Sequence, residues 1–514
     1  MGIRDFIFMI ATTTASHLAT GMRLNISSLP IRYFPQNINH TVSANSTDTN
    51  GTFGQRYQMV TEYFKPGGPI LFVQGAETGM PSIDELDFID YAPQLNAIVA
   101  VLEHRFFGDH IAGSYPVEFD VSNASTMTND TFAALTLDNV LNDGVNFVDW
   151  VKGIVPGAED SKVIYGGASY GGFLAVLARI RYPNAFWGAI ASSPTLKSFG
   201  PLSINTFRFH AAEWVNNVYG DISSQVVIKI ENAMSIFQQC STLGNCETNI
   251  PDLNICAQKT VHNYTALYRA ALRTYLLVSE YNYPYISRYP SPYPLQDLIN
   301  KTLAAKTVGQ VLQIPLLAAS WSTCVDPDNI NITQPGMAGI QPAFPYVTCA
   351  YYTVNDLSIP DDNILPGTYT RGNVPVCENL DWIPSDYYSA NEYFLQKYTL
   401  MNQHLDDLER LLIVHGSYDP IAAIGSPILT TTNMLNHSRV ILVDGIAHAE
   451  DSVSEVIESR GLKPQLDEVR DLKVQHIKEW IGQGNQTAMP SLGIDHRSGT
   501  ILLFLAFVIS QLVA

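Results

Sequence analysis

Short apolar runs alternate along the chain with longer stretches of helical periodicity. Six runs are largely apolar and rich in β-branched residues, as expected of strands buried on both faces of a sheet: 70–73, 97–102, 163–165, 187–191, 411–414 and 439–443. Apolar residues recur at helical spacing over 135–151, 173–182 and 466–481. This alternation predicts an α/β fold, in which helices cover both faces of a mostly parallel sheet.

The strand–helix alternation is lost between residues 195 and 393, where helical segments such as 225–240 appear and residues 275–293 are rich in tyrosine and proline. We interpret 195–393 as an inserted, mostly helical, disulfide-tied cap domain that divides the sheet domain into residues 21–194 and 394–484. The alternative is a continuation of the sheet, against which the clustering of cysteines argues. The six cysteines of the chain all lie in this insert: Cys240, Cys246, Cys256, Cys324, Cys349 and Cys377. Their even number predicts three disulfides, whose pairing the sequence leaves open.

The charge balance of the chain is acidic, with a formal net charge of −19 and a pI of about 4.9. Nucleic-acid partners are therefore not expected, because contact with phosphates needs a basic face. No Cys-x-x-Cys spacing indicates a zinc or redox site, and we expect no metal or other cofactor.

Both termini carry features of export. Residues 1–20 resemble a secretory signal peptide, and eleven Asn-x-Ser/Thr sequons favour passage through the secretory pathway. Residues 485–514 combine small residues, a polar spacer and the terminal apolar run 501–514, which is the layout of a GPI-attachment signal with its attachment residue between about 485 and 493. The alternatives are a tail helix packed on the domain and a short membrane anchor. We expect an extracellular or cell-surface protein that contacts the membrane only through the GPI anchor.

The segment Gly167-Ala168-Ser169-Tyr170-Gly171 fits G-x-S-x-G between a predicted strand and a predicted helix. This is the context of a nucleophile elbow, which would expose the Ser169 hydroxyl above the sheet edge. We expect a side chain at 167 or at 171 to collide with the tight turn. The alternative is a glycine-rich turn that holds a buried serine.

Two further residues follow predicted strands in the order that an α/β-hydrolase triad requires. Asp419 comes after the strand 411–414, and His448 comes after the strand 439–443. His448 would take the Ser169 proton, and Asp419 would fix the imidazole tautomer. Asp-Pro is also a common turn initiator, and Glu450 or Asp451 could compete as partners of the histidine.

The oxyanion hole is expected to combine the N–H of Tyr170 with an N–H from the loop after the first buried strand, at Gly75 or Ala76. Glu103, His104 and Arg105 follow the second strand. They could form a buried ion-pair network or contact substrate, and we favour the structural role.

The sequence resembles the serine peptidase family of lysosomal Pro-Xaa carboxypeptidase, dipeptidyl peptidase II and the fungal acid prolyl endopeptidases. The resemblance rests on Glu103-His104-Arg105-Phe106-Phe107-Gly108, Leu135-Thr136, residues 166–172, Gly416-Ser417-Tyr418-Asp419-Pro420 and Ala447-His448. It implies an α/β-hydrolase domain with an inserted helical cap, the triad Ser169, Asp419 and His448, and cleavage after proline, usually in acidic surroundings. Dimers occur among the relatives, so the resemblance allows a homodimer, while the sequence leaves the oligomeric state open.

Two positions depart from the family pattern. Ile421 replaces a tryptophan that helps form the proline pocket in relatives, and Phe173 stands where methionine or alanine is common. We expect Ile421, Phe173 and Glu77 to contact substrate. The predicted function is a secreted or surface-anchored serine peptidase that cleaves peptides, after proline, through an acyl-enzyme on Ser169. The rival interpretations are a carboxylester hydrolase and a catalytically silent surface adhesion protein of the same fold, and the choice between exopeptidase and endopeptidase action stays open.

Overall fold

A computed structural model describes most of the chain between residues 29 and 482. The described ranges are 29–40, 51–109, 111–120, 127–128, 130–196, 210–244, 246, 250, 252–328, 343–351, 356–359, 367–370, 408–425, 438–454 and 464–482. The predicted signal peptide, most of the sequons and the apolar tail lie outside these residues. The described sequon asparagines Asn39, Asn263 and Asn300 are exposed. In the described part of the chain, no helix is both long and apolar enough to cross a membrane.

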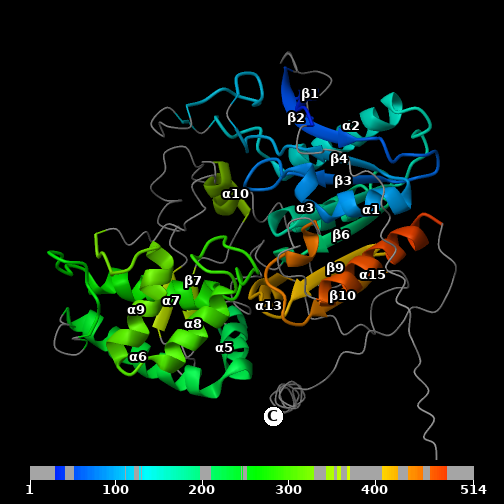
Figure 1. The fold of residues 1–514 in the computed structure, drawn as a ribbon. Helices are drawn as coiled ribbons and strands as arrows, with labels where there is room; N and C mark the ends of the chain where they lie inside the picture. The colour runs from blue at the N-terminus through cyan, green and yellow to red at the C-terminus, as the bar shows by residue number, and fades with distance from the viewer. Residues whose placement is uncertain are drawn as a thin grey trace, which may run out of the picture.

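One eight-stranded sheet organises the larger domain (Figure 1). Its strand order is β1-β2-β4-β3-β5-β6-β9-β10. The strands are β1 Arg32–Asn37, β2 Thr52–Val60, β3 Ile70–Gln74, β4 Ile98–Leu102, β5 Val163–Ala168, β6 Gly188–Ser192, β9 Leu411–Gly416 and β10 Arg439–Val443. β1 and β2 run antiparallel to their neighbours, and the other six are parallel. The parallel strands are thus the six apolar runs of the sequence, and their carboxyl ends lie along one edge of the sheet.

Helices cover both faces of the sheet, which explains why the central strands lack polar alternation. Helices α2 (Leu137–Ile154) and α3 (Tyr170–Arg181) share a buried core with Ile70 and Phe72 of β3. On the other face, α1 (Asp87–Leu95) and α15 (Pro464–Trp480) pack on Leu71 and Val73 of the same strand. Both side-chain rows of β3 are therefore buried, one against each helix layer.

The insert forms a helical lobe beside the carboxyl edge of the sheet (Figure 1). Helices α5 (His210–Ile222), α6 (Ser224–Leu243), α7 (Tyr264–Leu277), α8 (Pro294–Ala304) and α9 (Val308–Ser320) bury a core of their own. The disulfides Cys240–Cys246 and Cys256–Cys324 tie this lobe together. The side chains of Cys349 and Cys377 lie outside the described residues, so a third disulfide stays a prediction.

The α/β-hydrolase domain with an inserted, disulfide-tied helical cap is therefore confirmed, while the boundaries of the insert stay a prediction. One element inside the predicted insert belongs to the sheet domain by its packing. Ala343, Val347 and Tyr351 of α10 (Ala343–Tyr351) are buried in the core formed by α2 and α3 rather than in the cap core. The insert also contains the two-stranded sheet of β7 (Asp356–Ile359) and β8 (Gly367–Thr370).

Candidate active site

Ser169 lies at the turn between β5 and α3 in a strained backbone conformation. Its φ of 53° and ψ of −121° are unusual for a residue with a side chain, and such conformations cost about 1–3 kcal/mol. The turn is tight at Gly167, where a Cβ would stand 2.2 Å from the carbonyl oxygen of Gly171. The amide of Ser169 donates to the carbonyl of Ser192 at 2.9 Å, which fixes the turn against β6. The sharp turn expected of a nucleophile elbow is present.

The second glycine of the motif is less constrained than we expected. A Cβ at Gly171 would meet Ala76 Cβ at 3.5 Å and Gln74 O at 3.8 Å, which are ordinary contact distances. The prediction of a collision at 171 is therefore wrong, because the chain that approaches there is the edge of the loop after β3 and not the elbow itself. The crowded neighbour is Gly172, whose Cβ would lie 3.0 Å from Ser192 O.

Asp419 and His448 meet at the ends of β9 and β10. His448 Nδ1 lies 2.9 Å from Asp419 Oδ2, and the other oxygen of that carboxylate accepts the amide of Ile421 at 2.9 Å. The aspartate side chain is fully buried, and that of the histidine is 11% exposed. The two loops are also joined by their backbones, since the amide of Tyr418 donates to Ile446 O at 3.1 Å.

Glu450 and Asp451, the carboxylates that follow His448 in its loop, have other partners. Glu450 Oε2 accepts the amide of Ala447 at 2.8 Å. Asp451 Oδ2 accepts the hydroxyl of Ser192 at 2.6 Å and pairs with Lys473 Nζ at 2.8 Å. Both side chains are thus turned into the loop and the sheet, which leaves Asp419 as the carboxylate hydrogen-bonded to the imidazole.

The charge around His448 favours its protonated form. Burial alone would lower the pKa of the imidazole, but the charge and hydrogen bond of Asp419 and the charges of Glu280 and Glu77 outweigh it and raise the pKa to about 9. A protonated imidazole cannot accept a proton, so the proportion of the basic form rises with pH.

A cavity of about 540 Å³ lies at this edge of the sheet and is lined by both Ser169 and His448. The sheet domain contributes Glu77, Ile421 and Ala76 to its wall. The cap contributes Glu280, Tyr281 and Tyr285, and Phe344 comes from α10. The cavity is therefore closed by the insert on one side and by the strand ends on the other.

One N–H of the oxyanion hole is expected from the loop after β3, at Gly75 or Ala76. The amide of Gly75 donates to Leu102 O at 2.7 Å, because this glycine still continues the pairing of β3 with β4. The prediction of Gly75 as an oxyanion donor is therefore wrong. Ala76 is the next residue and lines the cavity, and Tyr170 is the first residue of α3, where N–H groups have no acceptor within the helix.

Two of the three residues expected to contact substrate reach the cavity. Glu77 and Ile421 line it, whereas Phe173 does not. Phe173 is fully buried and its ring stacks on that of Tyr170, with 6.1 Å between centroids. It lies one turn into α3, on the side of the helix that faces the core. Glu280, Tyr281, Tyr285 and Phe344 also line the cavity and were not expected from the sequence. The first three lie in the tyrosine-rich stretch 275–293, which was their only signal, and no pattern in the sequence marks Phe344.

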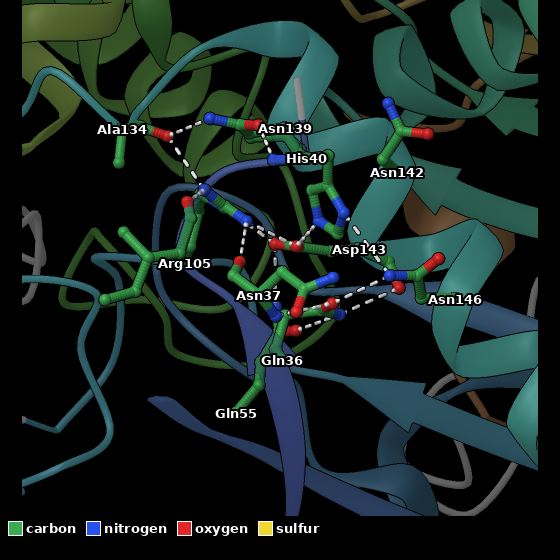
Figure 2. Close-up of polar contacts among 12 residues, drawn as sticks. Gln36, Asn37, His40, Gln55, Arg105, Ala134, Asn139, Asn142, Asp143 and Asn146 are labelled. Atoms are coloured by element: carbon green, nitrogen blue, oxygen red, sulfur yellow. Dashed lines mark hydrogen bonds and ion pairs between the residues drawn. The ribbon is translucent and has the colours of Figure 1, made fainter. Parts of the chain in front are cut away.

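Arg105 belongs to a buried polar network and does not contact the cavity (Figure 2). Its guanidinium pairs with both carboxylate oxygens of Asp143 in α2, with Nε at 2.7 Å and Nη2 at 2.5 Å. The remaining donors reach the carbonyl oxygens of Asn37, Ile38 and Ala134. Every N–H of the guanidinium is used within the protein, which supports the structural role.

His104 connects this network to the elbow. Its Nδ1 lies 2.8 Å from Arg105 O, a contact that requires an N–H, so Nε2 accepts the hydroxyl of Tyr170 at 3.1 Å. Burial lowers the pKa of His104 to about 4, which keeps the ring neutral and this tautomer in place. The Glu103 carboxyl pairs with Arg56 at 3.1 Å, and burial raises its pKa to about 8.

The chain is similar to known proteins of one serine peptidase family. The family model described as serine carboxypeptidase S28 matches residues 44–327. Lysosomal Pro-X carboxypeptidase from Bos taurus is 24% identical over 479 residues, which cover 88% of each chain. The Homo sapiens protein of that name is 29% identical over 326 residues, covering 59% of this chain and 58% of its own. Among solved structures, the peroxisomal alpha-beta-hydrolase Lpx1 from Saccharomyces cerevisiae aligns over 94% of this chain and 98% of its own, with 11% identity and a TM-score of 0.35.

Proposed function

Because the chain belongs to the serine carboxypeptidase S28 family, we propose that this serine peptidase hydrolyses the bond after a proline residue through an acyl-enzyme on Ser169. The relatives named Pro-X carboxypeptidase support removal of a residue from the carboxyl end as the mode of action. The observation that carries the catalytic roles is that His448 lines the same cavity as Ser169 and pairs with the buried Asp419 behind it.

In the proposed mechanism, neutral His448 takes the proton of the Ser169 hydroxyl through Nε2 while Nδ1–H donates to Asp419. The serine oxygen attacks the carbonyl carbon of the proline residue, and the N–H groups of Tyr170 and Ala76 stabilise the oxyanion. The imidazolium then protonates the leaving amine, which departs. Water repeats the sequence on the acyl-enzyme and releases the new carboxyl end.

The proline pocket would lie beside Ile421 and the aromatic side chains of Tyr285 and Phe344, all of which line the cavity. A proline ring is apolar and compact, so it packs well against aliphatic and aromatic surfaces. Ile421 replaces a broader aromatic surface. We therefore expect the ratio of kcat/KM for proline to kcat/KM for other residues to be smaller with isoleucine at position 421 than it would be with tryptophan there.

The first experiment compares wild-type protein with Ser169→Ala on proline-linked peptides that are blocked or free at each end. We expect the variant to lose at least about 10⁴-fold in kcat/KM. Cleavage only of peptides with a free carboxyl end would support the carboxypeptidase mode. Cleavage of esters alone by the wild type would replace the proposal with an esterase, and failure to react with either a substrate or a fluorophosphonate would exclude a serine hydrolase.

We also propose that the protein passes through the secretory pathway and is held at the cell surface by a GPI anchor. The sequons, the disulfides of the cap and the layout of residues 485–514 support this. Release of the protein from intact cells by a phosphatidylinositol-specific phospholipase would agree, whereas retention would contradict the anchor. The homodimer that the resemblance allows stays a prediction, which light scattering checks.

A further inference from the structure

Residues 280–285, which we call the tether, lie in the connection between α7 and α8 of the cap and contact the loop after β10 that carries His448. Both backbone groups of His448 are bonded to it. The amide of His448 donates to the carbonyl of Glu280 at 2.9 Å, and the hydroxyl of Tyr283 donates to the carbonyl of His448 at 2.8 Å. The peptide units on either side of the proposed general base are thus bonded to the cap, although the base itself belongs to the sheet domain.

The tether is in turn fixed to the cap helices. Asn282 is buried, and its Oδ1 accepts the amide of Leu295 in the first turn of α8 at 3.0 Å. The carbonyl of Tyr283 accepts the amide of Tyr293 at 2.7 Å, immediately before that helix. A displacement of the cap would therefore carry the tether with it and would disturb its bonds to His448.

The neighbours of His448 are held from the opposite side. The amide of Ala449 donates to the hydroxyl of Ser193 at 2.9 Å, and Asp451 is fastened to Ser192 and Lys473. The sheet domain thus fixes the rest of the loop. The cap holds the two peptide units that flank residue 448, and Asp419 holds the imidazole that projects from it.

Alternate tyrosines of the tether have different surroundings. Tyr281 and Tyr285 line the cavity, where a bound substrate would contact them, while Tyr283 lies between them and bonds to His448. The rings of Tyr283 and Tyr285 are stacked with an interplanar angle of 6° and 5.3 Å between centroids. Tyr281 meets Tyr283 edge to face with 6.2 Å between centroids. A substrate seated against the outer rings would therefore contact the two side chains that pack on Tyr283.

We propose that Tyr283 is a positioning residue, through which the docked cap aligns His448 with Ser169. This inference rests on the proposed function, because it assigns His448 as the general base. The alignment of His448 with Ser169 then depends on the bonds between the tether and His448. A peptide seated against Tyr281 and Tyr285 stabilises this alignment.

The test is Tyr283→Phe, which removes one hydroxyl and leaves the stacked rings in place. The matched control is Tyr219→Phe, because the buried hydroxyl of Tyr219 also donates to a backbone carbonyl, that of Tyr275, but wholly inside the cap. Two readouts are compared: kcat and KM on a proline-linked peptide, and the rate at which a fluorophosphonate labels Ser169.

For Tyr283→Phe we expect kcat and the labelling rate to fall about tenfold, with KM within about twofold, since one hydrogen bond to a backbone group is lost. Tyr219→Phe should leave both rates within about twofold. Equal rates in wild type and Tyr283→Phe would overturn the proposal, as would an equal loss in both variants that follows a lowered melting temperature.

Hydrogen exchange on the wild-type protein gives a test that needs no variant. We expect the amide of His448 to lose protection together with tether residues 280–285 as denaturant is raised. Persistent protection of that amide after the tether has exchanged would contradict the coupling. The labelling rate also separates this proposal from the preceding one: labelling without peptide cleavage would refute the peptidase but still report on Tyr283.

Discussion

At the scale of single residues, the elbow needs glycine at position 167 because no space is left there for a Cβ atom. Gly167 has a backbone oxygen 2.2 Å from where its Cβ would be, whereas Gly171 has only ordinary contacts. A backbone atom cannot be rotated away as a side chain can. The two glycines of one motif therefore differ in what they tolerate, although the motif treats them alike.

We expect Gly167→Ala to lower the free energy of unfolding by about 3 kcal/mol or more, because the turn must open to admit the methyl group. Gly171→Ala should stay within about 1 kcal/mol of the wild type, since alanine favours the helix that begins there. Thermal melting of both variants checks this. A Gly171→Ala protein that unfolds as easily as Gly167→Ala would show that the two positions are equally crowded.

The pH dependence of activity is also decided by individual side chains. Because the pKa of His448 is raised to about 9, the neutral base is scarce at acidic pH and the rate should increase as pH rises toward 9. This direction is opposite to the acidic working conditions that the family resemblance implies. Carboxylates in the cavity wall, Glu280 and Glu77, contribute to it.

Glu280→Gln should shift the acidic limb of the kcat/KM profile to lower pH, because removal of a negative charge destabilises the imidazolium. Below the pKa, each unit of decrease raises the neutral fraction about tenfold. The backbone bond from His448 to residue 280 is retained in this variant. Glu159→Gln, on an exposed loop, is the control. An acidic limb that stays in place or moves upward would contradict the assigned charge effect.

At the scale of elements, the antiparallel edge of the sheet is fastened to α2 by the Arg105–Asp143 pair. Both side chains are fully buried, and Gln55 of β2 donates to the same carboxylate at 3.1 Å (Figure 2). His40 reaches the other oxygen at 2.8 Å. A buried guanidinium is tolerated only with its counter-charge and its hydrogen bonds in place.

Asp143→Asn should therefore lower the free energy of unfolding by about 3–5 kcal/mol, since it leaves a buried cation without its partner. Lys301→Gln removes the surface pair with Asp297 on α8 and should cost at most about 0.5 kcal/mol. Denaturant titration of the two variants provides the measurement. Similar midpoints for both would show that the buried pair contributes no more than an exposed one.

At the scale of the whole molecule, residues from three hydrophobic cores line the active-site cavity, among them Tyr170, Val73 and Tyr281. The cap core is formed by α5 to α9, and the sheet has a core on each face. Trp214 of α5 donates to Ser417 O at 2.8 Å and packs with Ile421, so the cap also touches the loop that carries Asp419. A substitution in the cap core can thus lower the stability of the cap without touching the sheet cores. It can still affect the triad through the contact of Trp214 with the loop that carries Asp419.

Replacing both cysteines of Cys256–Cys324 by alanine should destabilise the cap by about 4 kcal/mol, because that bond closes a loop with a sequence separation of 68 residues. The same change at Cys240–Cys246, with a separation of 6, should cost about 2 kcal/mol. Calorimetry should show the cap transition moving more in the first variant while the sheet domain is little changed. A larger shift in the second variant would contradict the loop-length argument.

The parallel strands, the elbow and the positions of Ser169, Asp419 and His448 at strand ends could be predicted from the sequence, because each depends on local periodicity, glycine and chain order. Four other features could not be predicted from the sequence: the sheet hydrogen bond of the Gly75 amide, the burial of Phe173, the pairing of Arg105 with Asp143, and the hydrogen bond from Tyr283 to His448. Each of these is decided by a contact between distant segments, such as the 165 residues that separate Tyr283 from His448. Only the packed chain brings such groups within hydrogen-bonding distance, because local patterns specify an element without specifying what lies against it.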